Sequence, residues 1–356
     1  MIADIAQQVL GGDPINRDQA RQLIRTQGTD IYDLFFWANK LRIKFVGHRV
    51  KFCSIVAAKV GGCSEDCGFC SQSGHYQTPV QPRRLDTGEM FVAADEAIAH
   101  GASSFGIVNS GRGPTSKELD WMEPFFRQTA EQGKIRPCAT LGELDPDQAH
   151  RLKEMGVLRV NHNLETSRRF FPRIVSTHSY DDRLRTIRNA KAAGLSICSG
   201  GIFGMGEHWE DRLDVAFELR GLGVDVVPIN FLHAIDGTPL CGKVEPLEPA
   251  EALKIIALFR FILHDRELKI AGGREVILRD LQSWIFFAGA SSFLIGNYLT
   301  TLGRTPQQDH QMLHDLGLPY VTFDEMEHEA TLEPAPAPGT PATGHSESLM
   351  ALPLLS

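Results

Sequence analysis

Three cysteines close together are the sharpest chemical signal in the chain. Cys63, Cys67 and Cys70 form a CxxxCxxC pattern inside the segment GGCSEDCGFCSQ. Thiolates are soft ligands, and they are the usual protein ligands of iron–sulfur clusters. Three protein ligands leave one iron of a four-iron cluster open to a substrate or cofactor. The triplet therefore predicts an iron–sulfur centre with one open coordination position.

Spacing alone leaves two alternatives open. A structural zinc site normally has four ligands, and His75, which follows Cys70 closely, could supply the fourth. Buried thiols can also cluster by chance, because a free cysteine packs as a small hydrophobic side chain. The chain of 356 residues has 7 cysteines, too few for a disulfide scaffold, and residues 1–25 lack the apolar region of a signal peptide. We therefore expect a reducing, cytoplasmic compartment.

The elements that must position the triplet alternate between short apolar runs and amphipathic stretches. The strand signals lie at 50–55, 103–109, 135–141, 157–163, 195–200, 224–231, 268–273 and 292–296. Helical stretches between them include 117–132, 145–155, 180–193, 210–221 and 249–263. This alternation predicts an α/β fold, a (β/α)₈ TIM-type barrel, with a doubly wound open sheet as the alternative. The triplet follows the first strand, at the barrel end where active sites are built.

The two ends of the chain differ from its middle. Residues 1–45 are expected to form an N-terminal helical extension, and 46–320 the barrel with its C-terminal part. Residues 331–356 are rich in Pro and Ala and are expected to be disordered. The uncharged segment 281–303 contains glycines and polar residues, which favours a short buried helix and a strand over a membrane span. A net charge of −8 argues against nucleic-acid and anionic membrane partners.

The triplet, with Phe69 before its last cysteine and a strand before it, resembles the signature of radical S-adenosylmethionine (SAM) enzymes. Within that superfamily, several separate motifs look like the biotin synthase family, in the same order along the chain. They are Asn161–Thr166 (NHNLET), Cys198–Ile202 (CSGGI), Val227–Asn230 (VPIN), Gly237–Leu240 (GTPL) and Ala271–Glu275 (AGGRE). The resemblance covers roughly Phe45 to Leu318.

The resemblance implies both cofactors and partners. A 4Fe–4S cluster would bind SAM at its open iron, and an auxiliary cluster, 2Fe–2S or a variant, would supply sulfur. Dethiobiotin would be the substrate, an electron donor of flavodoxin or ferredoxin type would reduce the enzyme, and the protein would be a homodimer. The alternatives are another radical SAM enzyme of the same barrel, such as a methylornithine synthase or a hydrogenase-maturation enzyme, and a non-catalytic zinc-binding protein.

The auxiliary ligand set departs from the family's common form. By resemblance, Cys138, Cys198 and Arg274 match three of its positions, whereas the second-strand cysteine is replaced by Gly106. Glycine has no donor atom. Cys53 lies in the middle of the first strand signal, where its side chain can point into the barrel, so we expect it to replace the missing ligand. The alternative is a packed thiol, and Cys241 receives no role.

Polar residues near the fourth strand signal predict the SAM site. Asn161, Asn163 and Glu165 are spaced by two, so an extended chain would place them on one face. Burying them without partners would be costly, which indicates a polar ligand. By resemblance, these residues and Asn230 contact SAM and dethiobiotin, and Arg183 contacts the SAM carboxylate. The alternatives are a loop-capping role for Asn230 and a solvated helix charge for Arg183.

Overall fold

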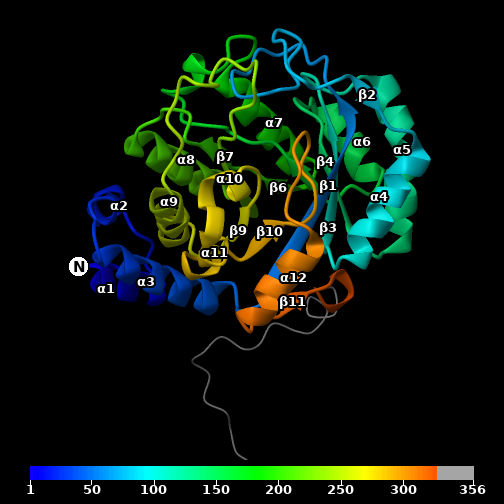
Figure 1. Cartoon of the computed structure of the whole chain (residues 1–356). Coiled ribbons are helices and arrows are strands. Elements are labelled where there is room, and N and C mark those ends of the chain that lie inside the picture. The colour runs from blue at the N-terminus through cyan, green and yellow to red at the C-terminus, as the bar shows by residue number, and fades with distance from the viewer. Residues whose placement is uncertain (327–356) are drawn as a thin grey trace, which may run out of the picture.

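Eight parallel strands close into a barrel in the computed structural model, which describes residues 1–326 (Figure 1). They are β1 (Val50–Val60), β3 (Ser104–Asn109), β4 (Arg136–Thr140), β5 (Arg159–Asn161), β6 (Ser196–Cys198), β8 (Val226–Phe231), β9 (Glu267–Ile270) and β10 (Ser292–Leu294). β10 pairs in parallel with β1, and this pairing closes the ring. The TIM-type barrel is therefore confirmed, and the open sheet is wrong.

Three further strands lie outside the ring and were not predicted. β2 (Arg83–Arg84) runs antiparallel to the end of β1, and β11 (Tyr320–Val321) runs parallel to its start. β7 (Gly201–Phe203) pairs with the second half of β8. The two-residue strands β2 and β11 are too short to show a hydrophobic period, and β7 follows β6 so closely that the sequence signal does not separate them.

Helices cover the outside of the barrel. They are α4 (Thr87–Ala99), α5 (Ser116–Gln132), α6 (Pro146–Glu154), α7 (Tyr180–Ala192), α8 (Trp209–Leu222) and α9 (Pro249–Ile262), followed by the shorter α10 (Arg274–Leu278), α11 (Trp284–Phe287) and α12 (Pro306–Asp315). Single turns of 3₁₀ helix occur at η1 (Phe171–Arg173) and η2 (Arg279–Leu281). Capping boxes begin α5, α6 and α7, where Thr115, Asp145 and Ser179 each accept a backbone N–H in the first turn.

The helices that precede the barrel pack on one side of it. α1 (Ile2–Leu10), α2 (Arg17–Ile24) and α3 (Asp30–Phe45) contact α8, α9 and α11. The Lys254 ammonium of α9 donates to the carbonyl oxygens of Ile24 and Thr26, the latter at 2.7 Å. This buried bond ties the N-terminal segment to the barrel's outer layer.

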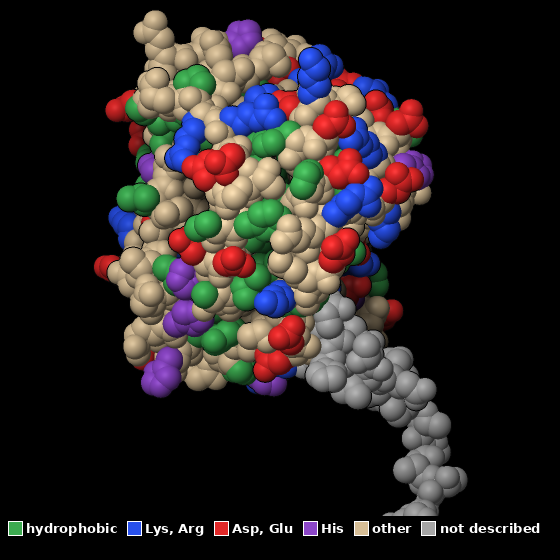
Figure 2. All heavy atoms as spheres, turned by 90° about the vertical axis from the view of Figure 1, so that its right-hand side faces the viewer, with side chains coloured by type: hydrophobic (Ala, Val, Ile, Leu, Met, Phe, Trp, Pro, Cys, Tyr) green, Lys and Arg blue, Asp and Glu red, His purple; other side chains and the backbone are tan. Residues whose placement is uncertain are grey.

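The uncharged segment near the C-terminus splits as expected, into the short helix α11 and strand β10. None of the helices in residues 1–326 is long and apolar enough to cross a membrane. On the face that carries α4 and α5, acidic and basic side chains are interspersed (Figure 2). The expected disordered tail, 331–356, lies outside the described residues.

Candidate active site

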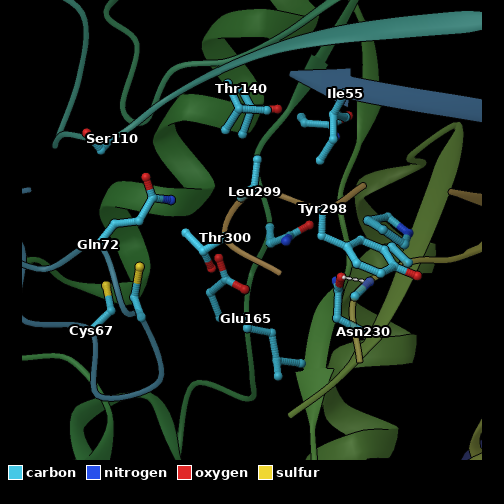
Figure 3. A pocket seen from close by; sticks show the side chains of 18 of the residues that line it. Ile55, Cys67, Gln72, Ser110, Thr140, Glu165, Asn230, Tyr298, Leu299 and Thr300 are labelled. Carbon is cyan, nitrogen blue, oxygen red and sulfur yellow. Dashed lines mark hydrogen bonds between the residues drawn. The ribbon is translucent and has the colours of Figure 1, made fainter. Parts of the chain in front are cut away.

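A cavity of about 380 Å³ opens at the carboxyl ends of the barrel strands. Its wall includes the three cysteines of the triplet and all five residues expected to bind SAM or substrate: Cys63, Cys67, Cys70, Asn161, Asn163, Glu165, Arg183 and Asn230. Figure 3 shows Cys67 on one side of this space and Asn230 and Tyr298 on the other. The fold therefore brings together residues that are far apart in sequence.

The cysteine loop leaves β1 through two glycines and folds back on itself. Gly61 and Gly62 have φ values of 72° and 60°, in the left-handed region that glycine adopts readily. The Cys63 amide donates to the Gln72 carbonyl oxygen at 3.0 Å, and the Cys70 amide donates to that of Cys67 at 2.9 Å. Burial raises the pKa of Cys70 to about 11. A bound metal would reverse this preference, because it stabilises the thiolate.

Two acidic residues inside the triplet anchor the loop to the segment before α7. The Asp66 carboxylate accepts the amides of Ser176 and Thr177 at 2.9 and 3.1 Å. The Glu65 carboxylate lies 2.6 Å from Nδ1 of His178, whose Nε2 lies 3.0 Å from a terminal nitrogen of Arg183. Because a guanidinium only donates, His178 carries its proton on Nδ1 and accepts at Nε2. Sequence reasoning missed this chain of contacts, since its members come from two separate loops.

Arg183 and Glu165 face each other inside the cavity wall. Arg183 is 9% exposed, so the solvated-charge alternative is wrong. Its Nη1 donates to the Asn163 carbonyl oxygen at 3.0 Å and lies 3.5 Å from a Glu165 carboxylate oxygen. Arg183 Nε and Glu165 Oε2 are buried without protein partners. Since unpaired buried polar atoms are costly, these two atoms favour a polar ligand in the cavity.

The spacing of Asn161, Asn163 and Glu165 led us to expect one extended segment, but the chain does not stay extended through all three residues. β5 ends at Asn161, and Glu165 has a φ of 67°. That expectation is wrong beyond the strand, because Glu165 turns into the left-handed region where its backbone bridges Gly201. All three side chains nevertheless line the cavity.

Asn230 both lines the cavity and joins two loops. Its Oδ1 accepts the Gly272 amide at 3.0 Å, and its Nδ2 donates to the Gly201 carbonyl oxygen at 3.2 Å. The side-chain amide therefore links the ends of β7, β8 and β9. The loop-capping alternative is therefore present in the structure, and the contact of Asn230 with a ligand stays a prediction.

A second group of thiols lies one layer deeper in the barrel. Cys53, Cys138 and Cys198 are buried, and the Lys269 ammonium lies 3.6 Å from the Cys53 sulfur. Burial raises the pKa of Cys138 to about 12, while the positive charges of Arg159 and Lys269 oppose that rise. Burial likewise raises the pKa of Cys198, again opposed by Lys269 and Arg159. Three thiols and two buried cations therefore share one polar layer.

Arg274 lies elsewhere, which contradicts its expected place beside the thiols. It is fully buried, one terminal nitrogen lies 2.7 Å from an Asp309 carboxylate oxygen, and its guanidinium lies over the Phe293 ring. Phe293 packs against Phe52 in the core outside the barrel. The cation among the thiols is instead Lys269. Its signal in the sequence was the alternation of Glu267, Lys269 and Ala271 along one strand, which places all three on the inner face.

The arrangement of the donor atoms in the described residues does not suit a single metal ion. Within residues 1–326 no three His, Cys, Asp or Glu side chains are arranged to hold a single ion. His75 Nε2 lies 2.9 Å from the Ser64 carbonyl oxygen and is not part of the cavity wall, so the zinc alternative lacks its fourth ligand. A cluster with a bound polar ligand fits better. Three thiols share one loop, and the unpartnered atoms of Arg183 and Glu165 belong to the same cavity.

Family models match most of residues 1–326. Residues 59–219 match the radical SAM superfamily, and residues 228–319 match the biotin and thiamin synthesis associated domain. The barrel and its cysteine loop therefore define a radical SAM protein. A biotin synthase of Geobacter sulfurreducens is 47% identical over 317 residues, covering 88% of this chain and 96% of that protein. One of Heliobacterium modesticaldum is 50% identical over 312 residues, covering 87% and 95%. The chain belongs to the biotin synthase family.

Solved structures of more distant proteins share the fold. A methylornithine synthase superposes with a TM-score of 0.77 at 18% identity, covering 91% of this chain and 99% of that one. A FeFe-hydrogenase maturase of Carboxydothermus hydrogenoformans gives a TM-score of 0.74 at 19% identity, covering 89% and 78%. At these identities the likeness shows a common barrel architecture.

Proposed function

We propose that this chain inserts sulfur into dethiobiotin to form biotin, with SAM consumed as the oxidant. One observation carries the proposal, namely two groups of thiols at two depths of one barrel. The triplet lies at the mouth of the cavity, and the second group, Cys53, Cys138 and Cys198, lies beneath its floor. A cluster held by the deeper group would be placed to donate sulfur to a substrate bound in the cavity above it.

Cys63, Cys67 and Cys70 would hold the SAM-binding 4Fe–4S cluster, which when bound and reduced supplies the electron that cleaves SAM to a radical. Arg183 would orient the SAM carboxylate. Its two terminal nitrogens are held by Asn163 and His178, which leaves Nε free to donate. Glu165 Oε2 is free to accept a ribose hydroxyl. The protein thus contributes binding and orientation, and the cofactor contributes the difficult chemistry.

Cys53, Cys138 and Cys198 would hold the auxiliary cluster, 2Fe–2S or a variant. Gly106 pairs with Cys138 and Ile55 across the sheet, and a Cβ at position 106 would lie 3.2 Å from the Ile55 Cγ2 atom. Ile55 therefore occupies part of the room that a cysteine at 106 would need. Lys269 and Arg159 would offset the negative charge of three thiolates in the low-dielectric interior.

Dethiobiotin would lie between the two thiol groups. Ile55, Val108 and Leu294 give the cavity an apolar wall that suits an aliphatic chain, and Asn161 adds a polar group. The closed ring of strands would keep water from reaching a carbon radical through the barrel wall. These residues hold and shield the substrate and take no part in bond making.

Anaerobic reconstitution with iron and sulfide tests the proposed reaction. With SAM and a strong reductant, dethiobiotin should stimulate formation of 5′-deoxyadenosine and yield biotin, whereas ornithine should do neither. Cys241→Ala is the matched control, because the Cys241 sulfur lies 3.4 Å from an Asp236 carboxylate oxygen and does not line the cavity, so the variant should behave as the parent. If dethiobiotin leaves SAM turnover unchanged in protein with its full iron content, the proposal is wrong.

The remaining partners follow from the family resemblance. A flavodoxin or ferredoxin would supply electrons, the enzyme would work in the cytoplasm, where such donors occur, and two chains would form a homodimer. Light scattering on the reconstituted protein measures the mass directly. A monomeric mass at micromolar concentration would show that the dimer is wrong, and the proposed reaction would not be affected.

A further inference from the structure

A loop between β10 and α12 lies across the cavity. We call residues 295–305 the strap; in Figure 1 it is the orange loop that rises from β10 and returns to α12. Leu299, Thr300 and Thr301 of the strap line the cavity, and the first two are visible in its wall in Figure 3. Thr300 reaches the cysteine loop, with its hydroxyl 3.2 Å from that of Ser71. The strap therefore forms one side of the cavity wall.

A buried carboxylate holds the end of the strap. Asp309 in the first turn of α12 is fully buried. One of its oxygens accepts from Arg274 at 2.7 Å, and the other accepts from Nε of Arg304, the last arginine of the strap, at 3.1 Å. Two guanidinium groups on one buried carboxylate make a charge-assisted anchor, which is stronger than a neutral hydrogen bond.

Arg274 also holds the start of the strap. Its Nε donates to the Tyr298 hydroxyl at 3.2 Å, and that hydroxyl donates to the Glu275 carboxylate at 2.7 Å. Its third nitrogen donates to the Gln282 side-chain oxygen at 3.2 Å. Every guanidinium nitrogen of Arg274 is thereby engaged, and two of the three partners belong to the strap or to the helix that follows it.

Open space lies on the other side of the strap. A second cavity of about 520 Å³ lies between the strap, β1 and α4, with Ala93, Ala97 and His100 on its far wall. Tyr298 and Leu299 line both cavities. A segment with room on both sides and anchors at both ends can move in the middle, because few packed atoms would have to be displaced.

We propose that Arg274 is a positioning residue. Through Tyr298 and Asp309 it holds the strap closed over the SAM cavity, and the strap moves into the second cavity to let substrate in. This gives the fully buried Arg274 a role that does not involve the thiols. The identity of that substrate, dethiobiotin, rests on the proposed function, whereas the movement of the strap does not.

Hydrogen exchange on the reconstituted protein tests the anchor. Arg274→Lys keeps the charge and removes the fork of donors, and Tyr298→Phe removes one hydroxyl. Peptides covering the strap should exchange about tenfold faster in both variants, as expected for the loss of a charge-assisted bond. Arg279→Lys is the matched control, because the Arg279 side chain forms an exposed ion pair with Glu248, and the substitution leaves the Arg279 carbonyl oxygen, which accepts from Gln282, unchanged. Iron content should equal the parent's in all three.

Steady-state kinetics distinguish a positioning role of Arg274 from a purely structural one. The KM for dethiobiotin should rise about tenfold in Arg274→Lys, with kcat less affected, because a loose strap weakens binding before it alters chemistry. Loss of iron from Arg274→Lys would make Arg274 a cluster ligand and overturn the proposal. Unchanged strap exchange in Tyr298→Phe, or faster exchange throughout the barrel, would also overturn it. Neither exchange nor iron content requires turnover, so failure of the proposed reaction would be seen separately.

Discussion

At the scale of single residues, the two groups of thiols have different surroundings. The triplet belongs to a loop whose backbone bonds hold it in place, so its cysteines are preorganised at the cavity mouth. Cys53, Cys138 and Cys198 instead come from three strands and lie among Lys269 and Arg159. A loop site can take an exchangeable ligand, whereas a buried site with fixed cations suits an anionic group kept away from water.

Replacing any one of Cys63, Cys67 or Cys70 with alanine should abolish reductive SAM cleavage, because three ligands on one loop leave none to spare. Formation of 5′-deoxyadenosine should fall at least about a hundredfold, while circular dichroism of the variant matches the parent. The assay is liquid chromatography of anaerobic reactions, with Cys241→Ala alongside. Parent-level cleavage in any one of the three variants would refute the assignment.

Cys53→Ala should separate the two clusters. The variant is expected to keep the SAM cluster and some uncoupled SAM cleavage, but to lose auxiliary iron and form no biotin, because Gly106 cannot replace the thiolate. Iron counting and Mössbauer spectra of purified protein measure the loss. A variant with the parent's full iron content and biotin yield would show that Cys53 is only a packed thiol.

At the scale of elements, loops from different parts of the barrel hold the site together. The cysteine loop is bonded to the segment before α7 through Asp66 and Glu65, and the strap is bonded to α10 and α12 through Arg274 and Asp309. Glycines let these elements approach closely. A Cβ on Gly200 would lie 1.9 Å from the Pro228 carbonyl oxygen, so the end of β6 can lie against β8 only without a side chain there.

The anchor of the cysteine loop should depend on pH. Burial opposes ionisation of Asp66, but hydrogen bonds from Ser176 and Thr177 outweigh it and lower its pKa from 3.8 to about 2. A carboxyl group with a depressed pKa in the folded state stabilises above its unfolded pKa and loses that contribution as pH falls. The apo parent should therefore be more stable than apo Asp66→Asn above pH 4, and the difference should vanish near pH 2. Urea titrations at several pH values measure it; a difference that does not change with pH would contradict the anchor.

Gly200→Ala should destabilise the barrel by about 3 kcal/mol or more, because the added methyl group meets backbone that cannot move without breaking the sheet. Gly221→Ala in α8 has no atom within 4 Å of its Cβ and should instead stabilise by about 0.5–1 kcal/mol. Denaturant unfolding of both apo variants provides the comparison. Similar stabilities for the two would mean that the approach at Gly200 is not tight.

At the scale of the whole molecule, we expect folding and metal binding to be coupled. The closed barrel buries Lys269 and Arg159 beside thiols from three strands. Without a cluster, the negative charge that would balance these cations is unfavourable, because burial raises the pKa of the Cys138 and Cys198 thiols. A ligand that binds only the folded chain stabilises it by mass action. The metal centres should therefore contribute to stability as well as to chemistry.

Removing iron and sulfide should lower the Tm by about 5 °C or more, since a few kcal/mol of cluster binding corresponds to such a shift in a chain of this size. Anaerobic calorimetry of the apo and reconstituted proteins measures the change, and restoring the clusters should restore the Tm. Cys53→Ala should show a smaller drop between its two forms than the parent. Equal Tm values for apo and holo parent would contradict the coupling.

The sequence alone was sufficient to predict the main helices and strands of the barrel and to single out the cysteine triplet. The eight strand signals and the five named helical stretches all correspond to elements of the structure. Both kinds of information are local, because hydrophobic period and cysteine spacing are contained in contiguous residues. The grouping of Cys138 with Cys198 followed from motif resemblance, and Cys53 was found by its position within a strand.

Only the tertiary structure decided which charged groups meet. Lys269 and Arg274 are close in sequence, yet Lys269 points into the barrel beside Cys53, and Arg274 points outward to Asp309. That difference depends on the register of β9, because a shift of one residue would turn Lys269 to the outer face, and on where α10 begins. The Glu65–His178–Arg183 chain and the strap anchor likewise join segments far apart along the chain. Contacts of this kind exist only once the barrel closes, because no local pattern specifies which loops its closure brings together.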